Sequence, residues 1–134
     1  LAGLELHGIL SKVNRPYDLK PAVDDSVRSG ALSAAQGEEA LSLLAAAIDS
    51  RSEWFSSDGR NELSLFDRFG KEKRPDRVVI TQQGVDIIDY KFGDFEPGYE
   101  KQVRGYMNIY RSLGYKNVRG YLWFVRTGEV RDVI

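Results

Sequence analysis

Hydrophobic positions in the first 50 residues recur at the spacing of amphipathic α-helices. This spacing predicts helices over residues 3–13 and 18–29, and the Asn-Arg-Pro sequence at 14–16 ends the first of them. Ser33 and Gln36 have the spacing of a capping box and predict the start of a third helix. The core stripe of that third helix is Leu41, Leu44 and Ile48. The N-terminal part of the chain is therefore expected to be helical.

From residue 54 onward the pattern changes to short runs that are typical of β-strands. Residues 74–91 hold two apolar runs around the turn sequence Thr81-Gln82-Gln83-Gly84, which predicts a hairpin. A loop is predicted at residues 56–59, and a fourth helix from Pro97-Gly98 to about Leu113. Single strands are predicted over residues 62–66, 118–125 and 129–134. This order predicts an α/β fold, with a mixed central sheet of about five strands flanked by helices.

Three of the charged residues in the hairpin are the most informative, namely Asp76, Asp89 and Lys91. Side chains alternate between the two faces of a strand, so Asp89 and Lys91 must point the same way. The hairpin would bring Asp76 close to both of them. Two carboxylates hold a hard divalent cation, and a lysine beside them steadies a water or a phosphate oxygen. This combination is what metal-assisted phosphodiester hydrolysis needs.

A solvated strand face with a weak surface ion pair is the alternative interpretation of these three residues. Their neighbours favour a site. Ile87-Ile88 precedes Asp89 and Val78-Val79-Ile80 follows Asp76, so both strands are expected to be largely buried. A charge in a buried strand is costly unless it is paired or bound to a metal.

The composition is that of one domain without cysteine chemistry. A chain of 134 residues with 42% hydrophobic and 29% charged residues is long enough for one core. The absence of cysteine excludes disulfides, thiolate-bound zinc and iron–sulfur clusters. No apolar run approaches the length of a membrane span and no signal peptide is visible, so we expect a cytoplasmic protein. The chain opens without methionine and ends inside a predicted strand, which indicates a fragment of a longer protein.

The net charge of −1 conceals a difference between the two halves of the chain. Residues 1–59 carry 5 basic and 9 acidic side chains, a balance of −4, whereas residues 60–134 carry 14 and 11, a balance of +3. The half with the hairpin is therefore better suited to a polyanion such as DNA. A pI of about 5.9 is low for a free-standing DNA-binding protein, so we expect a neighbouring domain to supply part of the affinity.

Five motifs occur in a fixed order along the chain. They are a glycine-x-x-x-histidine-x-x-leucine helix at residues 3–10, Glu62 on the first predicted strand, Pro75-Asp76-Arg77, Asp89-Tyr90-Lys91, and Gln102 with Tyr106 on a helix. In this order they resemble the PD-(D/E)XK nuclease superfamily, and within it the C-terminal nuclease domain of the RecB and AddA helicase–nucleases. The resemblance implies a restriction-endonuclease-like fold over residues 1–134 as a single domain. It also implies a magnesium-dependent deoxyribonuclease of the exonuclease V type.

The resemblance also implies a metal site. Its ligands would be the side chains of His7, Asp76 and Asp89 and the main-chain carbonyl of Tyr90. Mg²⁺ is the implied cofactor, and Mn²⁺ is possible because it suits imidazole better. From the residues alone, His7 is more typical of a packed or surface histidine than of a ligand.

The remaining implied site residues surround that metal. Lys91 would be the catalytic lysine that positions the attacking water near the scissile phosphate. Glu62 would help to hold the metal or its waters, and Gln102 and Tyr106 would support the site and contact DNA. Gln102 and Tyr106 lie four residues apart and share a helical face, although Tyr106 fits an apolar core stripe equally well.

Three functions follow from these observations. The leading hypothesis is the exonuclease module of an ATP-dependent helicase–nuclease in double-strand-break repair and recombination, with DNA as substrate and a helicase domain or subunit as partner. The chain has no GxxxxGK[ST] phosphate-binding loop, so we expect no ATP hydrolysis by that route. A non-catalytic DNA-binding or subunit-docking module is the second hypothesis, and it ranks lower because no motif residue is lost. The third is a stand-alone nuclease of defence type.

Overall fold

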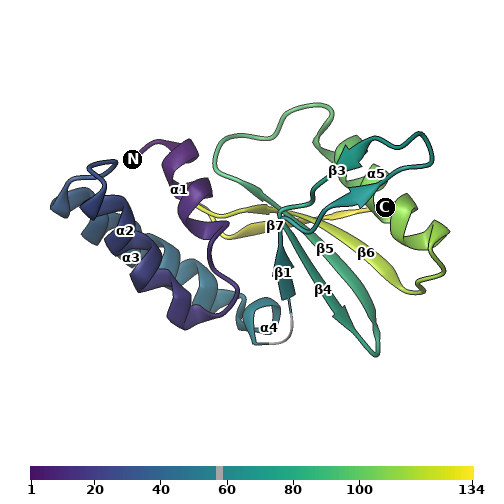
Figure 1. Ribbon diagram of the computed structural model, residues 1–134, viewed down its shortest axis with the longest axis horizontal. Coiled ribbons are helices and arrows are strands. Elements are labelled where there is room, and N and C mark those ends of the chain that lie inside the picture. Colours follow the sequence, from purple (N-terminus) through teal and green to yellow (C-terminus); the bar gives the residue numbers. More distant parts are fainter. Residues whose placement is uncertain (57–58) are drawn as a thin grey trace.

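A five-stranded mixed sheet forms the centre of the computed structural model, which describes residues 1–56 and 59–134 (Figure 1). The strand order is β1-β4-β5-β6-β7, and the strands are Gly59–Asn61, Arg77–Thr81, Gly84–Lys91, Val118–Phe124 and Glu129–Val133. Neighbours are antiparallel except for β5 and β6, which run parallel and are joined through helix α5, Tyr99–Ser112. The predicted mixed α/β sheet flanked by helices is confirmed.

The N-terminal helices pack against one face of this sheet, and α5 covers the other (Figure 1). They are α1 Gly3–Leu10, α2 Leu19–Arg28, α3 Ala34–Ser50 and α4 Ser52–Phe55, with a short 3₁₀ turn at Pro16–Asp18. The predicted capping box is present, since Ser33 Oγ accepts from Gln36 N at 3.1 Å and Ser33 N donates to Gln36 Oε1 at 2.9 Å. In the part of the chain that the structure describes, no helix combines the length and apolar character needed to cross a membrane.

Helix α1 is shorter than the sequence predicts. It ends at Leu10 rather than at residue 13. Lys12 and Val13 instead donate to carbonyls only three residues back, which is the tighter bonding of a turn. The proline at residue 16 then directs the chain away from a helical course.

The central strand β5 separates two apolar clusters by simple alternation. Ile88 and Tyr90 pack with the N-terminal helices, whereas Val85 and Ile87 pack against α5. Strand β6 behaves in the same way, because Trp123 lies in the first cluster and Leu122 in the second. Residues 89 and 91 of β5 therefore belong to the face that α5 covers.

The first strand differs from the prediction. Strand β1 covers Gly59–Asn61, and Glu62 follows it with a φ of 51°. The alternating residues 62–66 contribute to a separate two-stranded ribbon, in which β2, Leu65–Phe66, pairs with β3, Glu72–Lys73. The physical reason is that the Asn61 side chain donates to carbonyls in and after α1, which fixes β1 in the sheet. Of the loop predicted at residues 56–59, Ser57 and Asp58 lie outside the described residues.

The predicted hairpin is confirmed. Strands β4 and β5 pair from Arg77–Ile88 to Thr81–Gly84 and leave a two-residue turn. Gly84 has a φ of 148°, and the backbone of Asn117 approaches so closely that a Cβ at this position would collide with it. The turn therefore requires glycine on steric grounds.

Arg77 is a fully buried charge between the sheet and the helical layer. Its guanidinium donates to the carbonyls of Trp54, Val13 and Asn14 at 3.0, 3.2 and 2.8 Å, and to Asn61 Oδ1 at 2.9 Å. It also lies over the ring of Phe55, 4.4 Å from the centroid. One side chain thus connects strand β1, helix α4 and the segment after α1.

Replacing Arg77 with methionine should strongly destabilise the protein. Methionine retains the aliphatic stem but leaves several buried oxygens without a donor, so the free energy of unfolding should fall by about 3–5 kcal/mol. Urea denaturation measures this change. Arg28→Met is the control, because Arg28 is an exposed arginine on α2 and its loss should cost less than about 0.5 kcal/mol. Equal stabilities of the two variants would contradict this role for Arg77.

Candidate active site

Asp76, Asp89 and Lys91 meet at one end of the sheet, where β4 begins and β5 ends. Asp89 and Lys91 lie two residues apart on β5 and share the face that α5 covers. Asp76 immediately precedes β4, and continuing the register from the Arg77–Ile88 pair puts it opposite Asp89. The carboxyl groups of Asp76 and Asp89 interact directly as a result. The structure thus brings together the three residues on which the sequence interpretation rests.

Both carboxylate oxygens of Asp76 are engaged. Oδ1 lies 3.0 Å from Nε2 of His7, and Oδ2 accepts a 2.7 Å hydrogen bond from the main-chain N–H of Tyr90. Burial alone would raise the pKa of Asp76, but the hydrogen bonds with His7 and Asp89 hold that pKa below its ordinary value. The same bond to Asp76 outweighs burial and raises the pKa of His7. The pair therefore favours an imidazolium beside an ionised carboxylate.

His7 reaches this cluster from helix α1. Leu6, Ile9 and Leu10 on the same helix are buried in the core, which directs His7 toward the end of β5. Its ring makes edge contacts with the rings of Tyr90 and Phe92, at centroid distances of 6.0 and 6.2 Å. The histidine that only the resemblance singled out does lie beside the acids.

Asp89 is the most buried acid of the cluster, with 4% of its surface exposed. Nζ of Lys91 lies 2.7 Å from Asp89 Oδ2, an ion-pair distance, although Oδ2 receives no hydrogen bond of suitable direction. The two charges still attract each other strongly, because the attraction between charges depends on their distance. Burial and then the Asp76 carboxylate raise the pKa of Asp89 to about 7, which Lys91 opposes only in part.

Lys91 is held from a second side by Tyr99. The ammonium lies 3.9 Å from the centroid of the Tyr99 ring, and only 16% of the lysine side chain is exposed. Tyr99 is the first residue of α5 and was not among the predicted site residues. The sequence could have indicated Tyr99, because it lies in the first turn of the helix that follows the hairpin. Such a crossover helix begins near the end of the preceding strand.

Tyr106 satisfies both alternatives that the sequence left open. Its ring belongs to the apolar cluster under α5 and is 5% exposed. Its hydroxyl bonds to Gln102, and burial followed by the charges of Asp89 and Asp76 raises the pKa of Tyr106 to about 12. Gln102 itself is exposed one helical turn earlier. This pair therefore lines the side of the cluster that α5 covers.

The side chains of Glu62 and Tyr90 do not join the two acids. Glu62 is exposed outside any strand; its main-chain N–H donates to the carbonyl of Asp76 at 3.1 Å and its side chain lies 3.9 Å from Arg74. Its charge still contributes to the raised pKa of His7. The Tyr90 ring is buried on the opposite face of the sheet, with its hydroxyl 3.3 Å from Asn61 Oδ1. The main chain of Tyr90 therefore adjoins Asp76, whereas its ring contacts His7.

The donor atoms suit a divalent cation but are not preassembled around one. Among the described residues, no group of three or more His, Cys, Asp or Glu side chains is arranged to hold a metal ion. His7 and Asp76 bond to each other, and Lys91 engages Asp89. The chemistry nevertheless fits, because two carboxylates and an imidazole lie together, and the buried Oδ2 of Asp89 has Lys91 as an ion-pair partner but receives no hydrogen bond of suitable direction. A cation bound here would have to displace the bond between His7 and Asp76.

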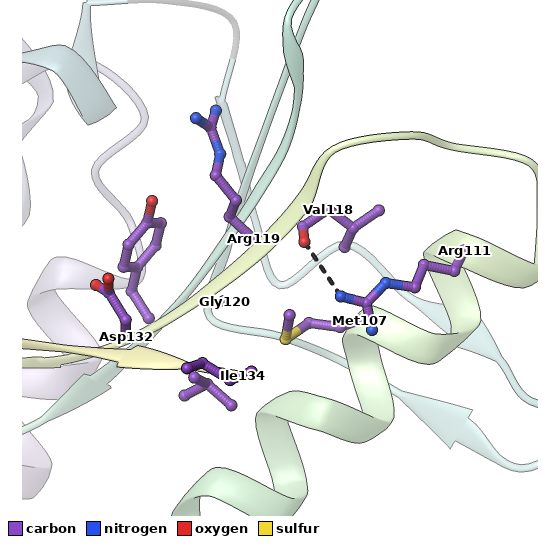
Figure 2. Close-up of a pocket in the computed structure, with 9 residues that line it drawn as sticks. Met107, Arg111, Val118, Arg119, Gly120, Asp132 and Ile134 are labelled. Carbon is purple, nitrogen blue, oxygen red and sulfur yellow. Dashed lines mark hydrogen bonds between the residues drawn. The ribbon is translucent and has the colours of Figure 1, made fainter.

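The pocket in Figure 2 lies at the other end of the sheet. It has a volume of about 290 Å³ and is lined by the second half of α5 with parts of β6 and β7. Arg111 donates to the carbonyl of Val118 there at 3.4 Å. Val118 pairs with Val85 at the start of β5, whereas Asp89 pairs with Leu122 farther along. This pocket contains none of the predicted site residues.

No protein-family model matches the chain, and no curated protein matches its sequence. Its function therefore has to be inferred from the cluster itself.

Replacing Asp89 with asparagine should stabilise the metal-free protein at neutral and alkaline pH. The pKa of Asp89 is about 7 in the folded protein, above the value of about 3.9 for an unfolded chain. The folded state therefore binds the additional proton, so stability falls as pH rises from about 4 to about 7. The raised pKa of His7 acts in the same direction at the upper end of this range, whereas the lowered pKa of Asp76 stabilises the protein above its unfolded value.

The Asp89→Asn substitution would remove the part of this pH dependence that comes from Asp89, while the charges of Asp76, Lys91 and His7 around it are retained. The expected gain in the free energy of unfolding is at most about 4 kcal/mol at about pH 8 and near zero at about pH 4. Urea denaturation in EDTA at both pH values measures it. Asp132→Asn, at an exposed position of β7, should show no such dependence. A gain of the same size at both pH values would be inconsistent with a raised pKa of Asp89.

Proposed function

We propose that the chain is a metal-dependent deoxyribonuclease domain of PD-(D/E)XK type, with a restriction-endonuclease-like sheet, that hydrolyses phosphodiester bonds in DNA. What supports this is one arrangement: the buried Asp89, held between Asp76 and Lys91 at the end of the hairpin. An acid that is buried to this degree, and whose charge Lys91 offsets only in part, costs stability. Strongly perturbed acids with specific charged partners are typical of functional sites.

In this proposal His7, Asp76 and Asp89 hold the cation, together with the main-chain carbonyl of Tyr90. Mg²⁺ suits the carboxylates and the carbonyl, and the imidazole makes Mn²⁺ an acceptable substitute. When bound, the cation lowers the pKa of a water and offsets charge on the phosphate. Asp76 retains its orientation after losing the bond to His7, because the N–H of Tyr90 still holds its other oxygen.

Lys91 is the residue that contacts the reacting groups most directly. Strand alternation points it to the same face as Asp89, and the Tyr99 ring limits the positions of its ammonium. From there Nζ donates hydrogen bonds to the attacking water and to a nonbridging phosphate oxygen. The first bond orients the water toward phosphorus, and the second stabilises the charge that develops in the transition state. Gln102 and Tyr106 support the site from α5.

We further propose a helicase domain or subunit as the neighbour of this domain. The chain would then be the exonuclease module of an ATP-dependent helicase–nuclease in double-strand-break repair. The balance of +3 over residues 60–134 supports a neighbour, because so small a charge gives weak DNA binding by itself. A stand-alone nuclease of defence type is the alternative. A GxxxxGK[ST] loop elsewhere in the parent protein would distinguish the two.

A non-catalytic DNA-binding or subunit-docking module is the second candidate function. The observation that favours it is that the charged groups partly satisfy one another, His7 with Asp76 and Lys91 with Asp89. Such a cluster holds the end of the sheet together without a metal. The two candidates differ in whether the protein cleaves DNA when a divalent cation is added.

Asp89→Asn and Lys91→Ala should each lower the rate of DNA cleavage by about a hundredfold or more. Asp89→Asn removes the negative charge of a metal ligand. Lys91→Ala removes the ammonium group that orients the water and the phosphate. Release of nucleotides from linear single- and double-stranded DNA, with Mg²⁺, Mn²⁺ or EDTA, measures the rate. EDTA should abolish cleavage by the unaltered protein.

Asp86→Asn is the matched control for this experiment. Asp86 lies on the same strand but faces the opposite side of the sheet, where Arg119 pairs with it at 2.7 Å. Cleavage by this variant should equal that of the unaltered protein. Full activity of both Asp89→Asn and Lys91→Ala would mean that the reaction occurs elsewhere, and DNA binding without cleavage in either metal would identify the second candidate.

A further inference from the structure

The β2–β3 ribbon presents aromatic rings to solvent. Phe66 is 64% exposed, and Phe69, in the turn between the two strands, is 80% exposed. The guanidinium carbon of Arg68 lies 4.8 Å from the centroid of the Phe69 ring. Large exposed rings that gather on one short element are typical of a contact surface.

Two adjoining hollows separate this ribbon from α5, beside which β3 lies in Figure 1. One has a volume of about 530 Å³ and reaches Phe69, and the other has a volume of about 560 Å³ and reaches Gln102 and Tyr106. Lys73 and Gly105 line both, so the two form one ribbon groove. Its inner end is Tyr106, which packs under α5 on the same face of β5 as Asp89 and Lys91. The ribbon groove therefore connects the exposed Phe69 with the candidate active site.

The acids of the ribbon are already engaged by hydrogen bonds and by an ion pair. Asp67 Oδ1 accepts from the main-chain N–H groups of Phe69 and Lys71, at 2.8 and 2.9 Å. Glu72 accepts from Ser64 at 2.7 Å and lies 3.4 Å from Arg74. Lys73 and Lys101 take part in none of the ion pairs between described residues. The groove thus places two lysines that form no close ion pair with a described residue beside a flat apolar ring.

We propose that the ribbon groove binds an unpaired polynucleotide strand, with a base stacked on Phe69 and phosphates contacted by Lys73 and Lys101. This rests on the proposed function, because the strand would continue past Gly105 to Asp89 and Lys91. Beyond that function, the ribbon groove would give the protein a preference for single-stranded over double-stranded nucleic acid. In a duplex each base is stacked on its neighbours, so only an unpaired base offers a free face to Phe69.

A protein partner would also cover Phe66 and Phe69. The charge of the ribbon groove favours the polynucleotide, since the lysines line the groove on both the ribbon and α5. Regular spacing of phosphates along a strand matches cations that are spread along a groove, and stacking on an aromatic ring tolerates any base. The surface therefore fits a strand without a required sequence.

Binding can be tested without cleavage, using the Lys91→Ala protein in EDTA. Fluorescence anisotropy with a labelled single-stranded oligothymidylate and with a duplex of equal length should show tighter binding of the single strand. Phe69→Ala in this background should weaken that binding by about tenfold. Gly105→Leu should have a similar effect, because the leucine would occupy the ribbon groove.

Gly105→Leu is a suitable probe because it should fold normally. A Cβ added at Gly105 meets no atom within 4 Å, and leucine is a better helix former than glycine. Gly105→Ala controls for the change in helix propensity, and Tyr17→Ala controls for the loss of an exposed ring, since Tyr17 is 77% exposed on the helical layer. Both controls should bind like the parent protein, and thermal unfolding verifies that every variant is folded.

Equal affinity for single strand and duplex would overturn the proposal, and so would unchanged binding by both Phe69→Ala and Gly105→Leu. Failure to bind either oligonucleotide would also overturn it and would point to a protein partner. The assay is independent of catalysis. The unaltered protein could fail to cut DNA while Phe69→Ala and Gly105→Leu still weaken binding of the single strand. That result would support the ribbon groove and contradict the proposed nuclease function.

Discussion

The junction between the helical layer and the sheet depends on one buried cation, the guanidinium of Arg77. Its donors are distributed among carbonyls after α1, in α4 and on β1, so removing it would free three elements at once. Arg77 and Asp76 are adjacent and point to opposite faces. At the start of β4, Arg77 therefore holds the segment that follows α1, the helix that carries His7. Its neighbour Asp76 supplies the carboxylate that His7 contacts. Fold and site are joined through two consecutive residues.

The charges of the site form two pairs, His7 with Asp76 and Lys91 with Asp89, but Asp89 is more deeply buried than Asp76. His7 and Asp76 lower the cost of each other's charge, whereas Asp89 is buried so deeply that Lys91 compensates it only in part. A protein selected for stability alone would favour an apolar residue at position 89, because this position of β5 is buried. A bound cation would supply the positive charge that Lys91 does not, and would offset the cost of burying Asp89. Binding of that cation would then stabilise the folded protein.

Local patterns predicted much of this molecule. Alternation along β5 placed Asp89 and Lys91 on one face, and the spacing of Ser33 and Gln36 marked a helix start, because both depend on near neighbours in the chain. The position of β1 could not be predicted, since it depends on Asn61 bonding to carbonyls about 50 residues away. The contact between His7 and Asp76 spans 69 residues and had no local signal. Tyr99 was missed because its contact with Lys91 depends on where α5 starts in space.

Because β5 is paired on both sides, by β4 and by β6, its register cannot shift to absorb a change in length. One residue gained or lost between Val85 and Asp89 would move every following side chain to the opposite face of the sheet. The tyrosine ring would then face α5, and the acid would enter the aromatic cluster around Trp123. Insertions and deletions of odd length in this strand should thus disrupt the fold.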